Sequence, residues 1–422
     1  MKSAAVPLLF LLGSTNAAPI TQAPIYEISL DRHRLTQVEF SLTLPSEEEL
    51  LFSSRKPSTR SNLVPKCGSI SLKRIGAEKW VKPSGCTEVR WSEPLSNLDT
   101  ESFDGSSPIS GWSRQHELWL LTGTLAWLRF KGQPTAPVHI IARGNEKSLS
   151  VTSKLPADSS IPIAIVVGRP AHTYSAGGFT IDVYGEAPSG PEQERLERLL
   201  VSTLADWRRD LFSPTSRPED HLNYVWFGSS PGAEPGIFAS ANSDAILIQY
   251  IRDPKSRDPD AKLAAGIFGT GAHEAFHALG AVSGAPAWAN ESLATYFAYA
   301  AARQHLKGKS LRLLSELVNA KSEKPLFGIE QAVERGDQSD YESFYSKGAR
   351  FWGAIDKVLT IKPNGSGKLA ALIKQTNGLA GLNWSNADAI AAYLDRYSNG
   401  RAGPIVRCYL VDSSCREANR PL

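Results

Sequence analysis

The sequence predicts a multidomain α+β protein, with a β-sandwich-like N-terminal domain followed by a mainly α-helical domain that has a small β-sheet. Two observations carry this prediction. Up to about residue 184, short runs rich in β-branched and aromatic residues alternate with clusters of Pro, Gly and Ser, as in antiparallel sandwiches. After the Gly- and Pro-containing segment 185–191, apolar residues recur at helical spacing. This change of pattern predicts a domain boundary near residue 185.

Residues 1–17 have the pattern of a secretory signal peptide. Lys2 supplies a positive charge, residues 6–12 form a short apolar core, and Thr15-Asn16-Ala17 is a small-x-small cleavage site. The apolar run is too short to span a bilayer, and no later stretch approaches 18 apolar residues. We therefore expect an exported chain, secreted or periplasmic, without a membrane span.

The net charge limits the classes of binding partner that we expect, and the cysteine content bears on the redox state of the protein's compartment. The formal net charge of +3 is nearly balanced over 422 residues, so neither nucleic acid nor an anionic membrane is an indicated partner. The four cysteines form two local pairs, Cys67 with Cys86 and Cys408 with Cys415. Because an exported chain folds in an oxidising compartment, we expect each pair to form a short-range disulfide. Buried free thiols are the alternative, and a four-thiolate zinc site lacks the close spacing that it needs.

The expected N-terminal domain covers residues 18–184 and consists of strands. Five of the ten tryptophans lie in it, and we expect them to pack in its core rather than to form a carbohydrate platform. The polar segment 53–65 is expected to be a long loop. The predicted strands cover residues 25–30, 38–44, 69–74, 117–122, 138–142, 161–167 and 179–184.

The second half of the chain divides at Gly280, a natural end for a helix. We expect an α/β subdomain over 185–280 and a helical C-terminal subdomain over 281–422. Within the first, a helix over 192–211 precedes strands over 222–227 and 236–250 and a loop over 252–260. Segment 286–397 is helical in pattern almost throughout.

The segment His273-Glu274-Ala275-Phe276-His277 provides half of a catalytic zinc site. Residues four apart share one face of a helix, so both imidazoles can bind one metal ion. Glu274 then lies beside that ion, where its carboxylate can act as general base on metal-bound water. The motif predicts one Zn²⁺ per chain.

A hydrolytic zinc site needs a third protein ligand, and Glu291 is the candidate. Gly280 ends the first helix, and Pro286 is suited to the first turn of the next. In a short αα-hairpin, His277 and Glu291 then lie at nearly the same depth, roughly 4.5 and 7.5 Å from the connection. The alternative is a solvated acid near a helix N-terminus. Thr295, one turn later, is placed to hydrogen-bond a ligand.

The flanking sequence resembles gluzincin metallopeptidases, the clan of thermolysin and the aminopeptidase-N-like enzymes. The stretch from Trp288 to Tyr296, WANESLATY, is similar to their WxNExxAxY segment, and Tyr345-Ser346-Lys347-Gly348-Ala349 is similar to their YxKGA motif. The resemblance covers roughly residues 180–360. It implies a thermolysin-like catalytic domain and a peptidase activity. It also implies that the Tyr345 hydroxyl stabilises the tetrahedral oxyanion, with Tyr341 as the alternative.

Three departures from the family pattern leave the subfamily open. The gap of 13 residues between His277 and Glu291 is shorter than is usual in those aminopeptidases, and Ser292 stands where Gly is usual. Their GxMEN segment, whose Glu binds the free amino terminus, corresponds here to 236–244, which has no Glu at that place. An exopeptidase that acts on free amino termini is therefore disfavoured. We expect an extended peptide to bind along 236–248, with Gly236 and Asn242 as residues of this substrate strand.

Other hydrolase classes fit the sequence poorly. A metzincin needs a third His where Ser283 stands and a Met-turn, yet Met1 is the only methionine. The serine-hydrolase pattern at 228–232 has Pro231 where a backbone N–H is required. The sequence thus predicts a secreted zinc metallopeptidase that acts on a peptide or protein, with its oligomeric state open. The alternative is a non-catalytic secreted binding protein on a peptidase-like fold.

Overall fold

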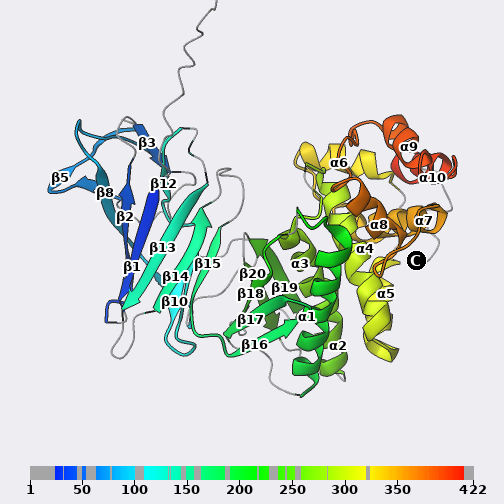
Figure 1. The fold of residues 1–422 in the computed structure, drawn as a ribbon, viewed down its shortest axis with the longest axis horizontal. Coiled ribbons are helices and arrows are strands. Elements are labelled where there is room, and N and C mark those ends of the chain that lie inside the picture. The colour runs from blue at the N-terminus through cyan, green and yellow to red at the C-terminus, as the bar shows by residue number, and fades with distance from the viewer. Residues whose placement is uncertain are drawn as a thin grey trace, which may run out of the picture.

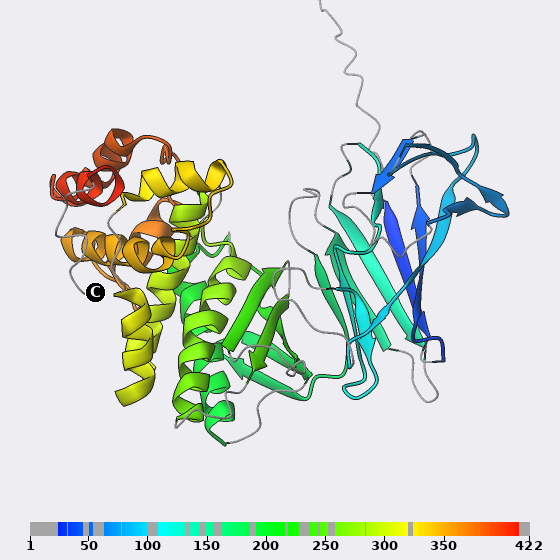
Figure 2. The same ribbon diagram turned by 180° about the vertical axis from the view of Figure 1, so that it is seen from behind.

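A computed structural model describes most of the chain. The described residues are 24–31, 33–44, 50–53, 63–76, 78–99, 109–131, 133, 135–143, 149–155, 163–185, 191–215, 218–227, 236–242, 245–251, 258–282, 284–319 and 324–412. The predicted signal peptide and Cys415 lie outside them. No helix in these ranges is long and apolar enough to cross a membrane. Figures 1 and 2 show a lobe of strands at one end, helices at the other, and a further sheet between them.

The N-terminal lobe is built from strands only. A seven-stranded sheet has the order β14-β13-β1-β2-β8-β4-β5, and two four-stranded sheets have the orders β15-β11-β10-β9 and β12-β3-β7-β6. The strands are β1 (Ile25–Asp31), β2 (Gln37–Thr43), β3 (Leu50–Ser53), β4 (Lys66–Cys67), β5 (Ile70–Ser71), β6 (Lys73–Gly76), β7 (Lys79–Val81), β8 (Glu88–Pro94), β9 (Ser96–Asn97), β10 (Gly111–Ser113), β11 (Leu118–Thr122), β12 (Leu128–Arg129), β13 (Ala136–Arg143), β14 (Leu149–Leu155) and β15 (Ala164–Gly168).

Alternation of apolar and polar residues explains how this lobe forms its core. In β2, Val38, Phe40 and Leu42 are buried while their neighbours are exposed or partly exposed. This is the pattern of a sheet that has one buried and one solvent-exposed face. The predicted core role of the tryptophans is confirmed, because all five are buried in one apolar cluster: Trp80, Trp91, Trp112, Trp119 and Trp127. The Trp91 ring stacks on Phe40.

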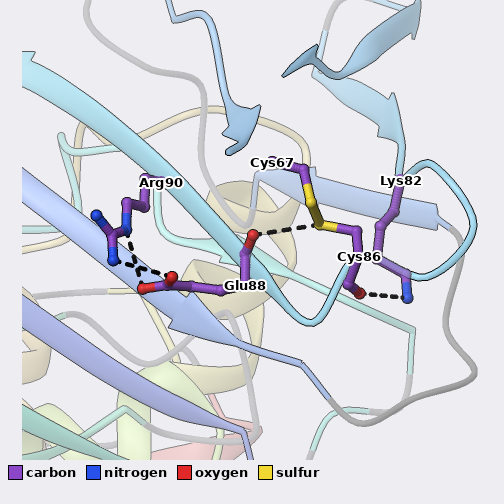
Figure 3. The surroundings of a disulfide bond; sticks show 5 residues. All are labelled: Cys67, Lys82, Cys86, Glu88 and Arg90. Atoms are coloured by element: carbon purple, nitrogen blue, oxygen red, sulfur yellow. Dashed lines mark hydrogen bonds and ion pairs between the residues drawn. A yellow bond between two sulfur atoms is a disulfide. The ribbon is translucent and has the colours of Figure 1, made fainter. Parts of the chain in front are cut away.

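A disulfide closes one end of this lobe. The predicted bond between Cys67 and Cys86 is present, with Cα atoms 6.0 Å apart. Figure 3 shows Lys82 beside it, whose Nζ donates a 2.9 Å hydrogen bond to the Cys86 carbonyl. Cys408 is also disulfide-bonded, and its predicted partner, Cys415, is outside the described residues.

The middle sheet has the order β16-β17-β18-β20-β19, with β16 (His172–Ala176), β17 (Phe179–Gly185), β18 (His221–Phe227), β19 (Gly236–Asn242) and β20 (Ala245–Ile251). Two sequence expectations are corrected here. The single strand expected over 236–250 is an antiparallel pair, β19 and β20. The hairpin of β16 and β17, which the sequence placed in the N-terminal domain, pairs with β18 and so belongs to this sheet.

Both faces of the middle sheet are covered, which explains why β18 is almost entirely buried. Tyr224 and Trp226 pack on the helical side. Val225 and Phe227 face the other way, in a small cluster with Leu120 and other residues of β11 and β15. The two lobes thus share an apolar contact through this sheet.

Helices form the rest of the chain. They are α1 (Pro191–Leu211), α2 (Pro259–Gly266), the π-helical turn η1 (Ile267–Gly271), α3 (Ala272–Leu279), α4 (Ala287–His305), α5 (Gly308–Val318), α6 (Leu326–Glu334), the π-helical turn η2 (Phe344–Gly348), α7 (Ala349–Val358), α8 (Lys368–Gln375), α9 (Ala387–Asp395) and α10 (Ala402–Leu410). The helix predicted over 192–211 is present as α1, and Leu196, Leu200 and Leu204 on one face of it are buried. This multidomain α+β layout is the predicted fold class.

Candidate metal centre

Helix α3 presents both histidines of the HExxH segment. It continues from α2 and η1, so the helical segment runs unbroken from Pro259 to Leu279. Ala272, Ala275, Phe276 and Leu279 are buried in the core, which leaves the other face for the polar residues. The helix ends at Gly280 as predicted, in the left-handed conformation (φ 64°) that glycine adopts without strain.

Helix α4 brings the third candidate ligand to the same place. It begins after Pro286, as predicted, and its first turn is held by a carboxylate from another helix. Glu330 of α6 accepts hydrogen bonds from the N–H groups of Ala287 (3.3 Å) and Trp288 (3.1 Å). These donors have no partner within their own helix, so the cap fixes the turn that precedes Glu291.

The three candidate ligand atoms converge. The His273 Nε2 atom lies 3.0 Å from Glu291 Oε2 and 3.0 Å from His277 Nε2, and His277 Nε2 lies 3.4 Å from the same Glu291 oxygen. A tetrahedral zinc ion with bonds of about 2.0–2.1 Å separates its ligand atoms by about 3.3–3.4 Å. The three side chains therefore fit a zinc ion. Elsewhere in the described ranges, no group of three His, Cys, Asp or Glu side chains comes close enough to hold a metal.

Electrostatics within this triad favour an ionised carboxylate. Although burial acts against its charge, hydrogen bonds from His273 and His277 hold the pKa of Glu291 well below its ordinary range. Glu291 is therefore negatively charged at neutral pH, as a metal-binding carboxylate must be.

Thr295 lies between two of the candidate ligands. Its hydroxyl donates to the Glu291 backbone carbonyl at 2.9 Å, one turn earlier in α4. The same oxygen lies 3.1 Å from His273 Nδ1. Because the hydroxyl proton is engaged, Nδ1 must be the donor in that second contact, as it has to be in a histidine that binds a metal through Nε2. The contact predicted from spacing alone is present.

Glu274 projects beside the triad and is anchored by the middle sheet. Its Oε2 accepts a 2.8 Å hydrogen bond from the backbone N–H of Ala241 in β19. Burial raises the pKa of Glu274, against the opposing effect of the two histidines. A carboxylate with a raised pKa is a better base for water than an exposed one. Sequence reasoning did not identify the Ala241 contact, because a backbone donor leaves no mark in the residue types.

Two tyrosines complete the wall of the site from η2 and the turn before it. The Tyr345 ring lies edge-on to His273, with centroids 5.5 Å apart. Tyr341 donates from its hydroxyl to Glu291 Oε1 at 3.2 Å. Burial raises the pKa of both phenols, so both keep their protons at neutral pH. Tyr341 had been considered only as an alternative oxyanion donor, and its contact with Glu291 was not predicted.

The predicted substrate strand borders this centre. Among the described strands, β19 lies at the edge of the middle sheet and pairs with β20. Gly236 and Asn242 are its first and last residues, opposite Ile251 and Ala245. The residue of β19 that bonds to the Glu274 carboxylate is neither of these but Ala241.

Comparison with known proteins gives matches in structure only. No family model matches the chain, and neither does any curated protein. An aminopeptidase N family protein from Idiomarina loihiensis superposes with a TM-score of 0.65 at 13% identity, over 93% of this chain and 76% of that one. A mutant M1 zinc metallopeptidase from Deinococcus radiodurans, bound to a Tyr-Ser-Ala substrate, gives 0.54 at 16% identity, over 95% and 96%. The chain thus has the fold of M1 aminopeptidases.

Proposed function

We propose that this chain is an exported zinc metallopeptidase of the gluzincin type, with one zinc ion held by His273, His277 and Glu291. The observation that carries the proposal is the convergence of two imidazole nitrogens and one carboxylate oxygen at 3.0–3.4 Å, beside the second carboxylate of Glu274. The M1-like fold is compatible with it. Zinc bound there would supply a Lewis acid that polarises a carbonyl and lowers the pKa of water.

The chain's own residues then divide the remaining work. Glu274, held in place by Ala241, takes a proton from the attacking water and later gives it to the leaving amine. Tyr345 keeps its proton and can donate it in a hydrogen bond to the oxyanion of the tetrahedral intermediate. An extended peptide would lie along β19, the last strand in the order of the middle sheet. These roles require a peptide or protein substrate.

The decisive experiment compares three forms of the purified protein: wild type, Glu274→Gln and a control, Glu334→Gln, at an exposed position at the end of α6. Each is stripped of metal, reloaded with zinc, and assayed for zinc content and cleavage of peptides with free and acetylated amino termini. We expect one zinc per chain in all three forms and a loss of about 10²–10⁴-fold in hydrolysis for Glu274→Gln alone.

The other outcomes are equally informative. A wild-type protein that binds no zinc contradicts the proposal outright. Zinc binding without hydrolysis that depends on Glu274 favours the alternative, a non-catalytic binding protein on a peptidase-like fold. Equal cleavage of acetylated and free peptides would indicate an endopeptidase. Export is tested separately by sequencing the amino terminus of the released protein, which we expect to begin at residue 18.

A further inference from the structure

The carboxylate of Glu291 faces different partners with its two oxygens. Oε2 lies 3.0 Å from His273 Nε2 and 3.4 Å from His277 Nε2. Oε1 accepts the hydroxyl proton of Tyr341 at 3.2 Å. An ionised carboxylate has only acceptor sites, so a tyrosine hydroxyl can bind one oxygen while the other faces a cation. Oε2 thus faces the candidate metal site, and Oε1 faces the Tyr341 hydroxyl.

The position of Tyr341 is fixed by its surroundings rather than by Glu291. Its ring packs edge-on to Phe344, which is fully buried, and to Tyr345, with centroid distances of 5.1 and 5.8 Å. Its backbone N–H is bonded to the Gln338 carbonyl at 3.1 Å. The hydroxyl is therefore presented to Glu291 by a packed turn, and little side-chain entropy is lost on making the bond.

The two tyrosines have different neighbours although they are four residues apart. Tyr341 donates its hydroxyl proton to the carboxylate of a candidate ligand, whereas Tyr345 lies against the His273 ring, with its hydroxyl beside that of Tyr341. A hydroxyl already engaged with Glu291 is poorly placed to stabilise a substrate oxyanion. This separates the two roles that the sequence left open between these residues.

From this geometry we infer that Tyr341 is a positioning residue for the metal: it holds Glu291 so that Oε2 alone is directed at the two histidines. The inference rests on the proposed zinc site but not on peptidase activity. Partners that orient a metal ligand change metal affinity about 10–100-fold when they are lost. Tyr341 thus contributes to zinc affinity, and Tyr345 to the chemical step.

The test measures zinc affinity, by competition with a chelator, in the full-length wild type, Tyr341→Phe and Tyr345→Phe. We expect the zinc dissociation constant to rise about 10–100-fold for Tyr341→Phe and to change little for Tyr345→Phe. At saturating zinc, Tyr345→Phe should lower kcat more than Tyr341→Phe does. Melting of the metal-free proteins shows whether either variant has lost its fold.

A double-mutant comparison shows whether Tyr341 acts on zinc binding through Glu291. In a Glu291→Ala background the acceptor is gone, so adding Tyr341→Phe should not weaken zinc binding further. Unchanged zinc affinity in Tyr341→Phe, or the same loss in the Glu291→Ala background, would overturn the inference. If Tyr341→Phe weakens zinc binding but the wild type cleaves no peptide, the proposed peptidase function is contradicted. The role of Tyr341 in zinc binding is then still supported.

Discussion

Replacing Gly348 by alanine should force apart the two helical segments that carry Glu291 and Tyr345. A Cβ atom built on Gly348 lies 2.3 Å from the Cβ of Ser292 and 3.2 Å from its Oγ. Carbon atoms in ordinary contact are about 3.5–4.0 Å apart, so the backbones must separate by roughly 1.2 Å. Both segments are buried at this point, with Ser292 0% exposed, so neither side chain can turn away.

The structure sets the size of the effect. Overpacking of this kind costs about 1–3 kcal/mol, and the better helix propensity of alanine offsets at most about 1 kcal/mol. Ser292 follows Glu291 directly, so the displacement reaches the metal centre. A misplacement of about 1 Å at a catalytic group can lower activity by about 10²-fold. Gly348→Ala should therefore lower the melting temperature, the zinc affinity and the rate of any hydrolysis together.

Three comparison variants make the assay specific. Gly328→Ala in α6 meets nothing closer than 3.4 Å and should be neutral or slightly stabilising. Adding Ser292→Gly to Gly348→Ala removes the colliding Cβ and should recover part of the loss. Adding Ser292→Ala retains that Cβ and should not. The recovery stays partial because either change at Ser292 removes the 2.8 Å bond from Trp352 Nε1. A Gly348→Ala protein that melts and binds zinc like the wild type would refute this reasoning.

Further predictions concern stability and the metal. Replacing Cys67 and Cys86 by serine opens a loop of 19 residues and should lower the free energy of unfolding by about 3 kcal/mol, as seen in thermal melts. Glu330→Ala removes the acceptor for two N–H groups of α4 and should cost about 1–3 kcal/mol in the same assay, while Glu330→Gln should cost less. Thr295→Val removes the acceptor for the His273 imidazole and should weaken zinc binding about 10-fold in chelator competition, while Thr295→Ser should not. Burial lowers the pKa of Lys347 to about 8, so between pH 8 and 10 the unfolded chain binds more protons and stability should rise with pH. Chemical unfolding at several pH values should show a smaller rise in Lys347→Met.

The sequence predicts that the candidate metal ligands converge because their determinants are local. Two histidines four apart need only a helix to share a face, and Gly280 and Pro286 mark where that helix ends and the next begins. These two boundaries bring Glu291 opposite the histidines without any knowledge of the rest of the fold. Thr295 follows from the same periodicity, since one helical turn separates it from Glu291.

What the sequence could not show depends on contacts between distant segments. The hairpin of β16 and β17 looks like the strands before it, and only its pairing with β18 assigns it to the middle sheet. The bond from Ala241 to Glu274 is made by a backbone N–H, which any residue other than proline would offer. Tyr341 resembles a packing residue until the distance to Glu291 is known.

The segment Tyr345-Ser346-Lys347-Gly348-Ala349 illustrates how a short motif combines chemistry with packing. Only its tyrosine lies beside the metal centre. Lys347 is buried and donates a 2.7 Å bond to the Lys324 carbonyl, which ties the segment before α6 to this turn. Gly348 permits the close approach to Ser292. Because α6 carries Glu330, which caps the helix of Glu291, the Lys347 contact helps to set where that ligand lies. The motif thus places Tyr345 and Glu291 in one packed unit, and its value for recognition comes from packing as much as from chemistry.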